Sequence, residues 1–543
     1  MVQLRRCRGL KQGWLVRVSG RVRRPRPALH PLLGDRRARL ARQGIYSELH
    51  APFAQVLQRR QGPILRLRSQ LAQRFRSAAG EPLGPLLAAF LMGRAVVELP
   101  DPLPVQFRAA GLSHALAASG FHLSVLLGLV MALVRRWARR AQLPPSALAI
   151  ALFVVLAGPQ PSVLRAALMG GVVLVIHHSG AQARSVGVLL FTLLLLLLWQ
   201  PAWILDLGFQ FSAAATAGLL LTAPVLQRRL PSALAVPMAA CLWTLPLQLW
   251  HFGLLPLYAV PLNLLAAPLL SLLITGAFAA GLVALLLPPL LPLLGWLLQW
   301  PAQLLLLLVA HGSALPLAQL VIGRPPILLL VMLSLGLLPW LLGLGRHRRA
   351  GLLLVGLACF WQWQRLHSDA LLQVQLGGSS LILIRHQGRG ALVSSSASAS
   401  SCRVATRLQQ GLGLPRLDWL VLLDPVPGAA KGCWRSLAAM QQVLPEGIVE
   451  SPGLRFKATD HGQRSGELLL GPQRWQLQRH SGSRLLAVPC PTTRTAPPKP
   501  VPSAGGRFSG VRSGKRSGTR CATARSAAAM RPAVQGDARS LNG

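Results

Sequence analysis

The sequence has 543 residues, of which 52% are hydrophobic, and its formal net charge at pH 7 is +43. A mean hydropathy of +0.46 excludes an ordinary soluble domain for the whole chain. Repeated leucine-rich stretches of roughly 15–25 residues indicate an α-helical protein with several membrane spans. The excess of arginine fits cytoplasmic loops and a GC-rich genome, and nucleic-acid binding is the sharper interpretation of the same charge.

The cysteines are scattered along the chain, and no two have the spacing of metal ligands. They are Cys7, Cys241, Cys359, Cys402, Cys433, Cys490 and Cys521. We therefore predict neither a zinc site nor a disulfide framework. The first forty residues are studded with arginine and contain no apolar run, so no signal peptide is predicted.

The composition changes along the chain and divides it into five parts. Residues 1–62 are polar and basic, and "WLVRVSGRV" alternates like a β-strand. Residues 63–110 include "ILRLRSQLAQRFRSA", which has the period of a basic amphipathic helix. Residues 111–364 are the membrane region. Short alternating strands at 370–490 predict a separate soluble domain, either α/β or mostly β. Residues 491–543 are rich in Pro, Ser, Arg and Gly, which predicts disorder.

Basic clusters predict the topology of the membrane region. We place "RRWARR" (Arg135–Arg140), Arg184, "QRR" (Gln227–Arg229) and "RHRR" (Arg346–Arg349) in the cytoplasm. The apolar stretches between them then pair off as two, two and four crossings. These stretches are 146–158, 162–178, 186–200, 207–225, 233–250, 257–287, 289–311 and 326–345. With one span before the first cluster and a short one at 350–364, we predict about ten spans and an outward-facing C-terminal domain.

The stretch "GLSHALAASGFHLSVLLGL" carries polar residues into an apolar segment. His114 and His122 are eight residues apart, so they share a helix face if the helix is continuous. Gly120 permits a break, which is tolerated where the backbone lines a cavity or is covered by protein. Two interpretations stay open: hydrogen-bonded contact between helices, and the wall of a water-filled pathway. A metal site would need a third donor, and none is evident.

Arg165, in "PSVLRAALMGG", is a cation near the outer end of its predicted span. It could pair with Asp206, bind a passing phosphate, or snorkel to the outer headgroups. Asp206 is the one acidic residue between Asp101 and Asp369, which argues against a transporter coupled to protons or sodium.

Two further stretches repeat this mixture of polar groups and helix breakers. "DLGFQFSAAATAGLLL" places Gly208, Gln210 and Ser212 in one span, and "PLNLLAAPLLSLL" places Asn263 near Pro268 in another. Several such spans within one bundle favour a conduit over a simple anchor.

Four stretches, in this order, resemble the signature motifs of the ComEC family of bacterial DNA-internalisation competence proteins: "FRAAGLSHALAASGFHLSVLLGL", "PSVLRAALMGG", "DLGFQFSAAATAGL" and "PLNLLAAPLLSLL". The resemblance covers about residues 84–345. It implies a polytopic α-helical channel that passes single-stranded DNA across the bacterial cytoplasmic membrane. The matching residues, which we expect to line or shape the pathway, are Gly111, His114, Ser119, Gly120, His122, Arg165, Gly208, Gln210, Ser212, Asn263 and Pro268.

The resemblance also implies two flanking domains. It makes residues 1–62 the remainder of an OB-like β domain and residues 370–490 a metallo-β-lactamase-like α/β domain. Where the family's metal ligands are expected, "LDWLVLLDPVPGAAKGCW" has Asp424, Val426, Gly428 and Ala429, and Ser394 replaces a usual aspartate. One carboxylate cannot hold a di-metal site, and His461 does not replace the lost ligands. We therefore expect a degenerate domain with no metal, no cofactor and no hydrolase activity.

The expected partners are single-stranded DNA, membrane lipids, a DNA receptor outside, a cytosolic ATPase or helicase, and a second copy of the chain. "RSGKRSG" (Arg512–Gly518) lacks the strand and helix of a Walker loop, so the energy must come from elsewhere. Three alternatives remain: a membrane-anchored extracytoplasmic nuclease, a small-solute secondary transporter, and a decayed, non-functional copy.

Overall fold

The structure is a computed structural model, and it describes residues 2–4, 14–59, 61–180, 182, 184–443, 448–458, 466–479 and 485–490. The chain divides into two compact units. The first contains Met1–Leu366 and Arg407–Pro415, and the second contains His367–Thr406 and Arg416–Gly543. The predicted disorder of 491–543, the "RSGKRSG" stretch and His461 lie outside the described residues.

The N-terminal part of the first unit is built from short strands. They are β1 (Val2–Leu4), β2 (Leu15–Val18), β3 (Arg21–Arg23), β4 (Glu48–Ala51) and β5 (Ala54–Gln58), with helix α1 (Arg36–Arg42) before β4. They form a sheet in the order β1-β4-β3 and a separate pair, β2-β5. The single strand predicted from "WLVRVSGRV" is present as two short strands, β2 and β3, which belong to different sheets.

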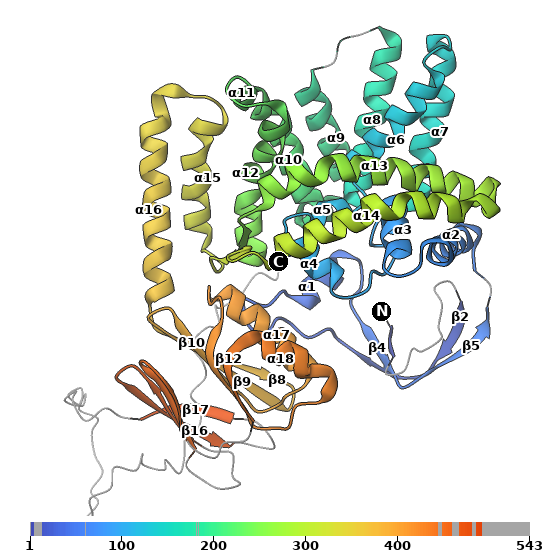
Figure 1. Ribbon diagram of the computed structural model, residues 1–543. Helices are drawn as coiled ribbons and strands as arrows, with labels where there is room; N and C mark the ends of the chain where they lie inside the picture. The colour runs from blue at the N-terminus through green and yellow to red at the C-terminus, as the bar shows by residue number, and fades with distance from the viewer. Residues whose placement is uncertain are drawn as a thin grey trace, which may run out of the picture. The chain divides into compact units, whose positions relative to one another are not determined.

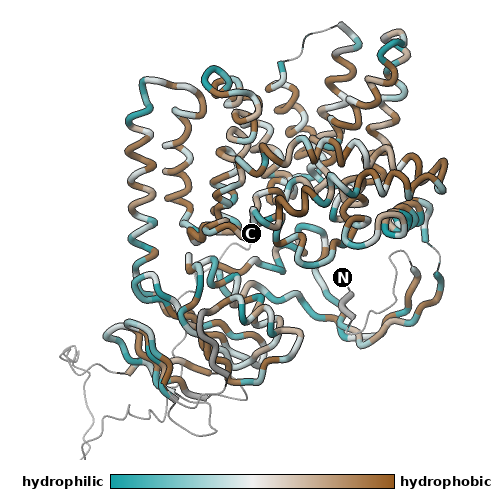
Figure 2. Tube along the Cα trace, in the orientation of Figure 1, coloured by the Kyte–Doolittle hydropathy of each residue, from teal (hydrophilic) through white to brown (hydrophobic). Residues whose placement is uncertain are grey.

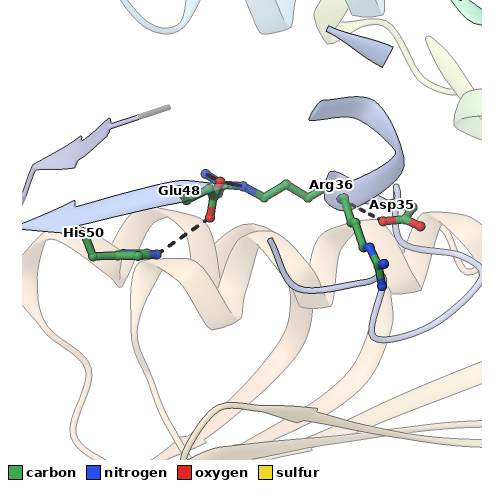
Figure 3. Close-up of polar contacts among 5 residues, drawn as sticks. Asp35, Arg36, Glu48 and His50 are labelled. Carbon is green, nitrogen blue, oxygen red and sulfur yellow. Dashed lines mark hydrogen bonds and ion pairs between the residues drawn. The ribbon is translucent and has the colours of Figure 1, made fainter. Parts of the chain in front are cut away.

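A buried carboxylate fixes α1 to this sheet. Glu48 of β4 is 5% exposed and accepts a hydrogen bond of 2.9 Å from Nε of Arg36. His50 places Nε2 3.7 Å from the other Glu48 oxygen, and Asp35 caps the start of α1 (Figure 3). The salt bridge thus compensates the buried charge of Glu48.

Four helices connect this part to the membrane region: α2 (Pro63–Ala79), α3 (Leu83–Met92), α4 (Leu103–Ala109) and α5 (Ser113–Leu116). Helix α2 confirms the predicted basic amphipathic helix. All ten residues of α3 are buried, so this helix lies inside the core of the unit. That core also takes side chains from α2, α6, α8, α13 and α14.

Long apolar helices make up the rest of the first unit. They are α6 (Gly120–Val134), α7 (Arg139–Ala157), α8 (Pro161–Ser179), α9 (Ser185–Trp199), α10 (Leu207–Leu221), α11 (Ala223–Gln227), α12 (Ser232–Phe252), α13 (Ala259–Leu286), α14 (Leu291–Ala314), α15 (Ile327–Leu341) and α16 (Arg348–His367). Short 3-10 turns (η1 Pro201–Leu205, η2 Pro288–Leu290, η3 Gly345–His347) and the pair β6 (Leu254–Pro256) with β7 (Gln319–Val321) join them. Within the described residues, five helical segments are long and apolar enough to cross a membrane, and five shorter helices are also apolar.

The four basic clusters lie at one end of the helices. They occupy the connections α6–α7, α8–α9, α11–α12 and α15–α16, which Figure 1 shows at the top of the unit. Figure 2 shows hydrophilic residues at these connections and apolar residues along the helices below them. The prediction that these clusters share one side of the membrane therefore fits the geometry.

Helices α13 and α14 differ from the predicted topology. Both run across the direction of the neighbouring helices (Figure 1), although 257–287 and 289–311 are predicted above as crossings. They pack against each other and against α2 and α3, while other apolar side chains of both helices, such as Leu282 and Trp300, stay exposed. Both helices are still long and apolar enough to cross a membrane, so the number of crossings stays a prediction.

The second unit contains two five-stranded sheets. Their orders are β12-β11-β10-β9-β8 and β13-β14-β15-β16-β17. The first sheet comprises β8 (Ala370–Leu376), β9 (Ser379–His386), β10 (Arg389–Ser394), β11 (Leu417–Leu422) and β12 (Ala438–Val443). The second comprises β13 (Ile448–Ser451), β14 (Leu454–Ala458), β15 (Gly466–Leu470), β16 (Gln473–Arg479) and β17 (Leu485–Pro489). Apolar side chains of both sheets share one buried core, which makes this unit a layered β structure.

Helices α17 (Ala399–Gly411) and α18 (Lys431–Leu437) follow β10 and β11, and the short turn η4 (Gly428–Ala430) precedes α18. Cys402 of α17 and Cys433 of α18 form a disulfide. The prediction that the chain has no disulfide is therefore wrong. The two cysteines are 31 positions apart, and this spacing does not predict a disulfide. Only the fold brings them together.

Candidate functional site

Three helices begin at the end of the bundle opposite the basic clusters. Helix α6 begins at Gly120, α8 at Pro161 and α10 at Leu207, and α8 packs against both of the others. The N-terminal end of a helix carries a partial positive charge from its unpaired N–H groups. Because these three helices pack together, candidate pathway residues from three sequence motifs lie at the same end of the bundle.

The helical run that contains His114 and His122 is broken before Gly120. Helix α5 ends at Leu116 and α6 begins at Gly120, so the two histidines do not share one continuous helix. His122 is 1% exposed, and its Nδ1 lies 3.0 Å from Oγ of Ser119. Its Nε2 is buried without a hydrogen bond of good geometry, although the backbone of Ala115 approaches the ring.

Arg165 is buried between α6, α8 and α10. Its side chain is 6% exposed, and its Nε donates a hydrogen bond of 2.8 Å to Oγ of Ser212. One of its terminal nitrogens lies 3.1 Å from the sulfur of Met169. The other would lie 3.5 Å from a side chain at Gly120, so the guanidinium lies beside the start of α6.

These contacts exclude two of the three interpretations of Arg165 within the described residues. The side chain does not extend to an exposed headgroup position, because it is buried. It does not pair with Asp206, whose carboxylate instead accepts the backbone N–H of Phe209 at 2.9 Å and caps α10. Among the described residues, no carboxylate forms an ion pair with Arg165.

Gln210 and His251 connect α10 to the end of α12. His251 Nε2 lies 3.1 Å from the amide oxygen of Gln210, whose nitrogen donates to the carbonyl of Ile204 at 2.8 Å. The side chain of Arg324 donates to the His251 carbonyl and, at 2.8 Å, to the carbonyl of Leu32. Burial lowers the pKa of the Arg324 guanidinium, with Arg407 as a smaller cause.

Arginines also lie on the carbonyl ends of other helices. Arg68 of α2 donates to the Val155 carbonyl in the last turn of α7 at 2.6 Å, and Arg74 donates to the Ala284 carbonyl in the last turn of α13. Arg324 does the same at the end of α12. A cation at a helix C-terminus satisfies unpaired carbonyls and offsets the negative end of the dipole.

The other predicted pathway residues stand apart from the Arg165 contacts. His114 is exposed on α5, Gly208 is exposed at the start of α10, and Pro268 is exposed within α13. Asn263 donates to the carbonyl of Ala259 in its own helix at 2.7 Å. Within the described part of the chain, none of these four residues forms a hydrogen bond with Arg165 or its partners, so their place in a pathway stays a prediction.

Gly111 has a structural role that its position explains. Its φ is +75°, and a side chain there would lie 2.5 Å from the Cβ of Ala259. Glycine is therefore required for the turn between α4 and α5 to pack against the start of α13.

Two residues of the site were not selected from the sequence. His251 has the appearance of an interfacial histidine near a helix end, and Arg324 lies in a connection without a motif. The Gly253 that follows α12 signals the helix end, which places His251 in the last turn. The partners of both residues come from distant segments, which no spacing rule reveals.

The segment where the resemblance places metal ligands lies at the ends of β10 and β11. The segment that follows β11 contains Asp424 and the short turn at Gly428–Ala430, and Ser394 ends β10. Within the described residues, no three His, Cys, Asp or Glu side chains lie close enough to hold a metal ion.

The fold and the site together define an α-helical membrane domain with a cationic, acid-poor end. The family model described as Competence protein matches residues 93–347. ComE operon protein 3 of Bacillus subtilis (strain 168) is 33% identical over 190 residues, which are 34% of this chain and 24% of that relative. The helical membrane region therefore matches the competence protein family, over just under half of the chain.

The chain spans about a quarter of the length of the curated relative that it matches. The match to the family model covers α4 through α15 and includes the segments that hold Arg165, Gln210 and His251. No solved structure matches the chain significantly.

Proposed function

We propose that the helical unit conducts single-stranded DNA from outside into the cytoplasm during competence, across the bacterial cytoplasmic membrane. The strand arrives at the end of the bundle where α6, α8 and α10 begin. Arg165 lies there, and it contacts the backbone phosphates as they pass. The match of residues 93–347 to the competence protein family supports DNA as the substrate.

The burial of Arg165 without a carboxylate is the observation that carries this proposal. A buried guanidinium costs free energy unless an anion or sufficient hydrogen bonds compensate it. A hydroxyl and a thioether sulfur are its partners in the described structure, and neither carries a charge. A phosphodiester supplies the missing charge, and guanidinium groups bind phosphate oxygens with two parallel hydrogen bonds.

The surrounding groups also favour a moving polyanion over a coupled cation. Asp206, the sole acidic residue between Asp101 and Asp369, is used as a helix cap. The N-terminal ends of three helices add partial positive charge, and arginines offset the carbonyl ends of α7 and α12. Hydroxyl and amide groups supply weak contacts that a strand can leave again.

A separate part of the proposal concerns the second unit. We propose that it has no hydrolase activity, because the loop after β11 offers one carboxylate where a di-metal site needs several ligands. Metal-dependent cleavage of DNA by the full chain in membranes, abolished by Asp424→Asn, would contradict this proposal.

A transformation assay tests the central proposal in a competent host whose own copy is deleted. Arg165→Gln removes the charge, and we expect uptake to fall at least about a hundredfold. Arg165→Lys keeps the charge without the planar fork, and we expect an intermediate loss. Arg136→Gln, in the exposed basic cluster after α6, is the matched control and leaves uptake within about twofold.

Each variant is first checked for its amount in the membrane. Full uptake by Arg165→Gln at a normal membrane level would show that the strand does not depend on this guanidinium.

A further inference from the structure

The second unit has a pair of parallel strands whose following connections leave from the same edge of the sheet. Strands β10 and β11 are parallel, with Ser394 paired to Leu422 at their ends. One connection leads into α17 and the other leads through Asp424 into α18. Among the described residues, no cluster of three metal-binding side chains joins these two connections.

Two bonds connect the segments. Cys402, on α17, and Cys433, on α18, form a disulfide with their Cα atoms 6.3 Å apart. Beside it, the buried Nε1–H of Trp434 donates to the carbonyl of Ala397 at 2.8 Å. Cys402 and Trp434 are both fully buried and Cys433 is half-buried, so the disulfide reaches from the core to its edge.

We propose that Cys402–Cys433 is a structural disulfide, formed outside the cytoplasm, that fixes the two connections in place of a metal. Disulfides persist in oxidising compartments and are rare in the cytosol. The bond joins two residues that are 31 positions apart, so it reduces the conformational freedom of the unfolded chain.

The compartment agrees with the membrane topology. Helix α16 begins at the basic cluster Arg346–Arg349 and ends at His367, and β8 begins at Ala370. If the basic cluster lies in the cytoplasm, the chain leaves α16 on the outer side. The disulfide and the arginine cluster are independent observations, and both favour a position of the second unit outside the cytoplasm.

The chemistry requires an electron acceptor. The two thiols lose two protons and two electrons as the S–S bond forms, and a dithiol–disulfide oxidoreductase of the cell envelope receives them. A thiolate of the chain attacks the disulfide of the oxidoreductase, and a mixed disulfide forms between the two proteins. The second cysteine of the chain then attacks this mixed disulfide and releases the reduced oxidoreductase.

Thiol counting on the full chain in native membranes tests the inference. The background carries Cys7→Ser, Cys490→Ser and Cys521→Ser, since Cys490 is itself disulfide-bonded. Cys241 and Cys359 are free and serve as internal references. After rapid denaturation with a maleimide polymer present, we expect two labels without reductant and four after reduction. Cys402→Ser frees Cys433, which gives three labels under both conditions.

Four labels without reductant would overturn the inference. Loss of the envelope oxidoreductase is expected to raise the count from two to four in the same background. Limited proteolysis provides a second readout, in which Cys402→Ser shortens the lifetime of the C-terminal fragment at least about tenfold. An unchanged lifetime would show that the bond holds nothing in place. Neither readout depends on DNA uptake.

Discussion

The Nε–H of Arg165 donates to Oγ of Ser212 across 2.8 Å and joins α8 to α10 inside the helical bundle. The bond connects residues of two separate sequence motifs, 47 positions apart. It orients a buried guanidinium toward the start of α6, where Gly120 leaves room for it. The orientation of Arg165 therefore depends on a hydroxyl from a neighbouring helix.

Removal of that hydroxyl tests the positioning of Arg165. We expect Ser212→Ala to lower transformation about tenfold, because a buried donor loses its acceptor and the guanidinium changes orientation. Thr216→Ala is the matched control one turn further along α10, since its hydroxyl bonds to the carbonyl of Ser212 in its own helix. An equal loss of transformation in both variants would mean that the effect comes from a change in α10 and not from the orientation of Arg165.

Substitutions at Asp206 distinguish a channel from an ion-coupled transporter. As a helix cap, it is replaceable by asparagine, which caps helices equally well but does not titrate. We expect Asp206→Asn to keep transformation within about twofold of the native level. Asp206→Ala is expected to destabilise the protein by about 1 kcal/mol in thermal unfolding in detergent. Loss of uptake in the folded asparagine variant would instead indicate a coupling carboxylate.

Gly218 permits the close packing of α10 on α12. A side chain there would lie 2.8 Å from the carbonyl of Ala239 and from the ring of Trp243. We expect Gly218→Ala to destabilise the protein by about 1–3 kcal/mol, measured as thermal unfolding in detergent. Gly187→Ala, in α9, meets no atom within 4 Å and is expected to change the stability little. Similar stability of both variants would mean that α10 and α12 are farther apart.

Arg68 caps the carbonyl end of α7 from outside the membrane helices. We expect Arg68→Ala to cost about 0.5–1 kcal/mol of stability, through the loss of a charge-assisted bond at a helix C-terminus. Arg66→Ala is the control, because Arg66 bonds to the carbonyl of Gln61 just before its own helix. Thermal unfolding at low and high salt measures both, and the Arg68 effect is expected to shrink at high salt. A larger loss in the control would contradict the capping role.

Much of the helical architecture could be predicted from the sequence, because the apolar runs end at basic clusters, prolines and glycines. The limits of α12 and α15 agree with the predicted stretches within a few residues. Hydropathy did not reveal that α13 and α14 run across the direction of the neighbouring helices (Figure 1), because composition does not give a helix its orientation.

The candidate site was predicted less completely. Ser119, His122, Arg165, Gln210 and Ser212 do lie at one end of three helices. His251 was not predictable as a partner, because helix packing alone brings it to Gln210. Met169 lies one turn after Arg165 in α8, so its spacing could have indicated this contact. Asp206 as a helix cap could have been predicted, because an aspartate just before an apolar helix is a capping signal.

Cysteine accessibility tests the hydrated route most directly. In a background without reactive cysteines, Ser119→Cys and Gln210→Cys are treated in intact cells with a membrane-impermeant, charged thiol reagent. Leu194→Cys, on the exposed apolar face of α9, is the lipid-facing control. Because the thiolate forms in water and not in lipid, we predict labelling at both test positions at least about a hundredfold faster than at the control. Labelling at Ser119 and Gln210 as slow as at Leu194 would contradict a water-filled path through these helices.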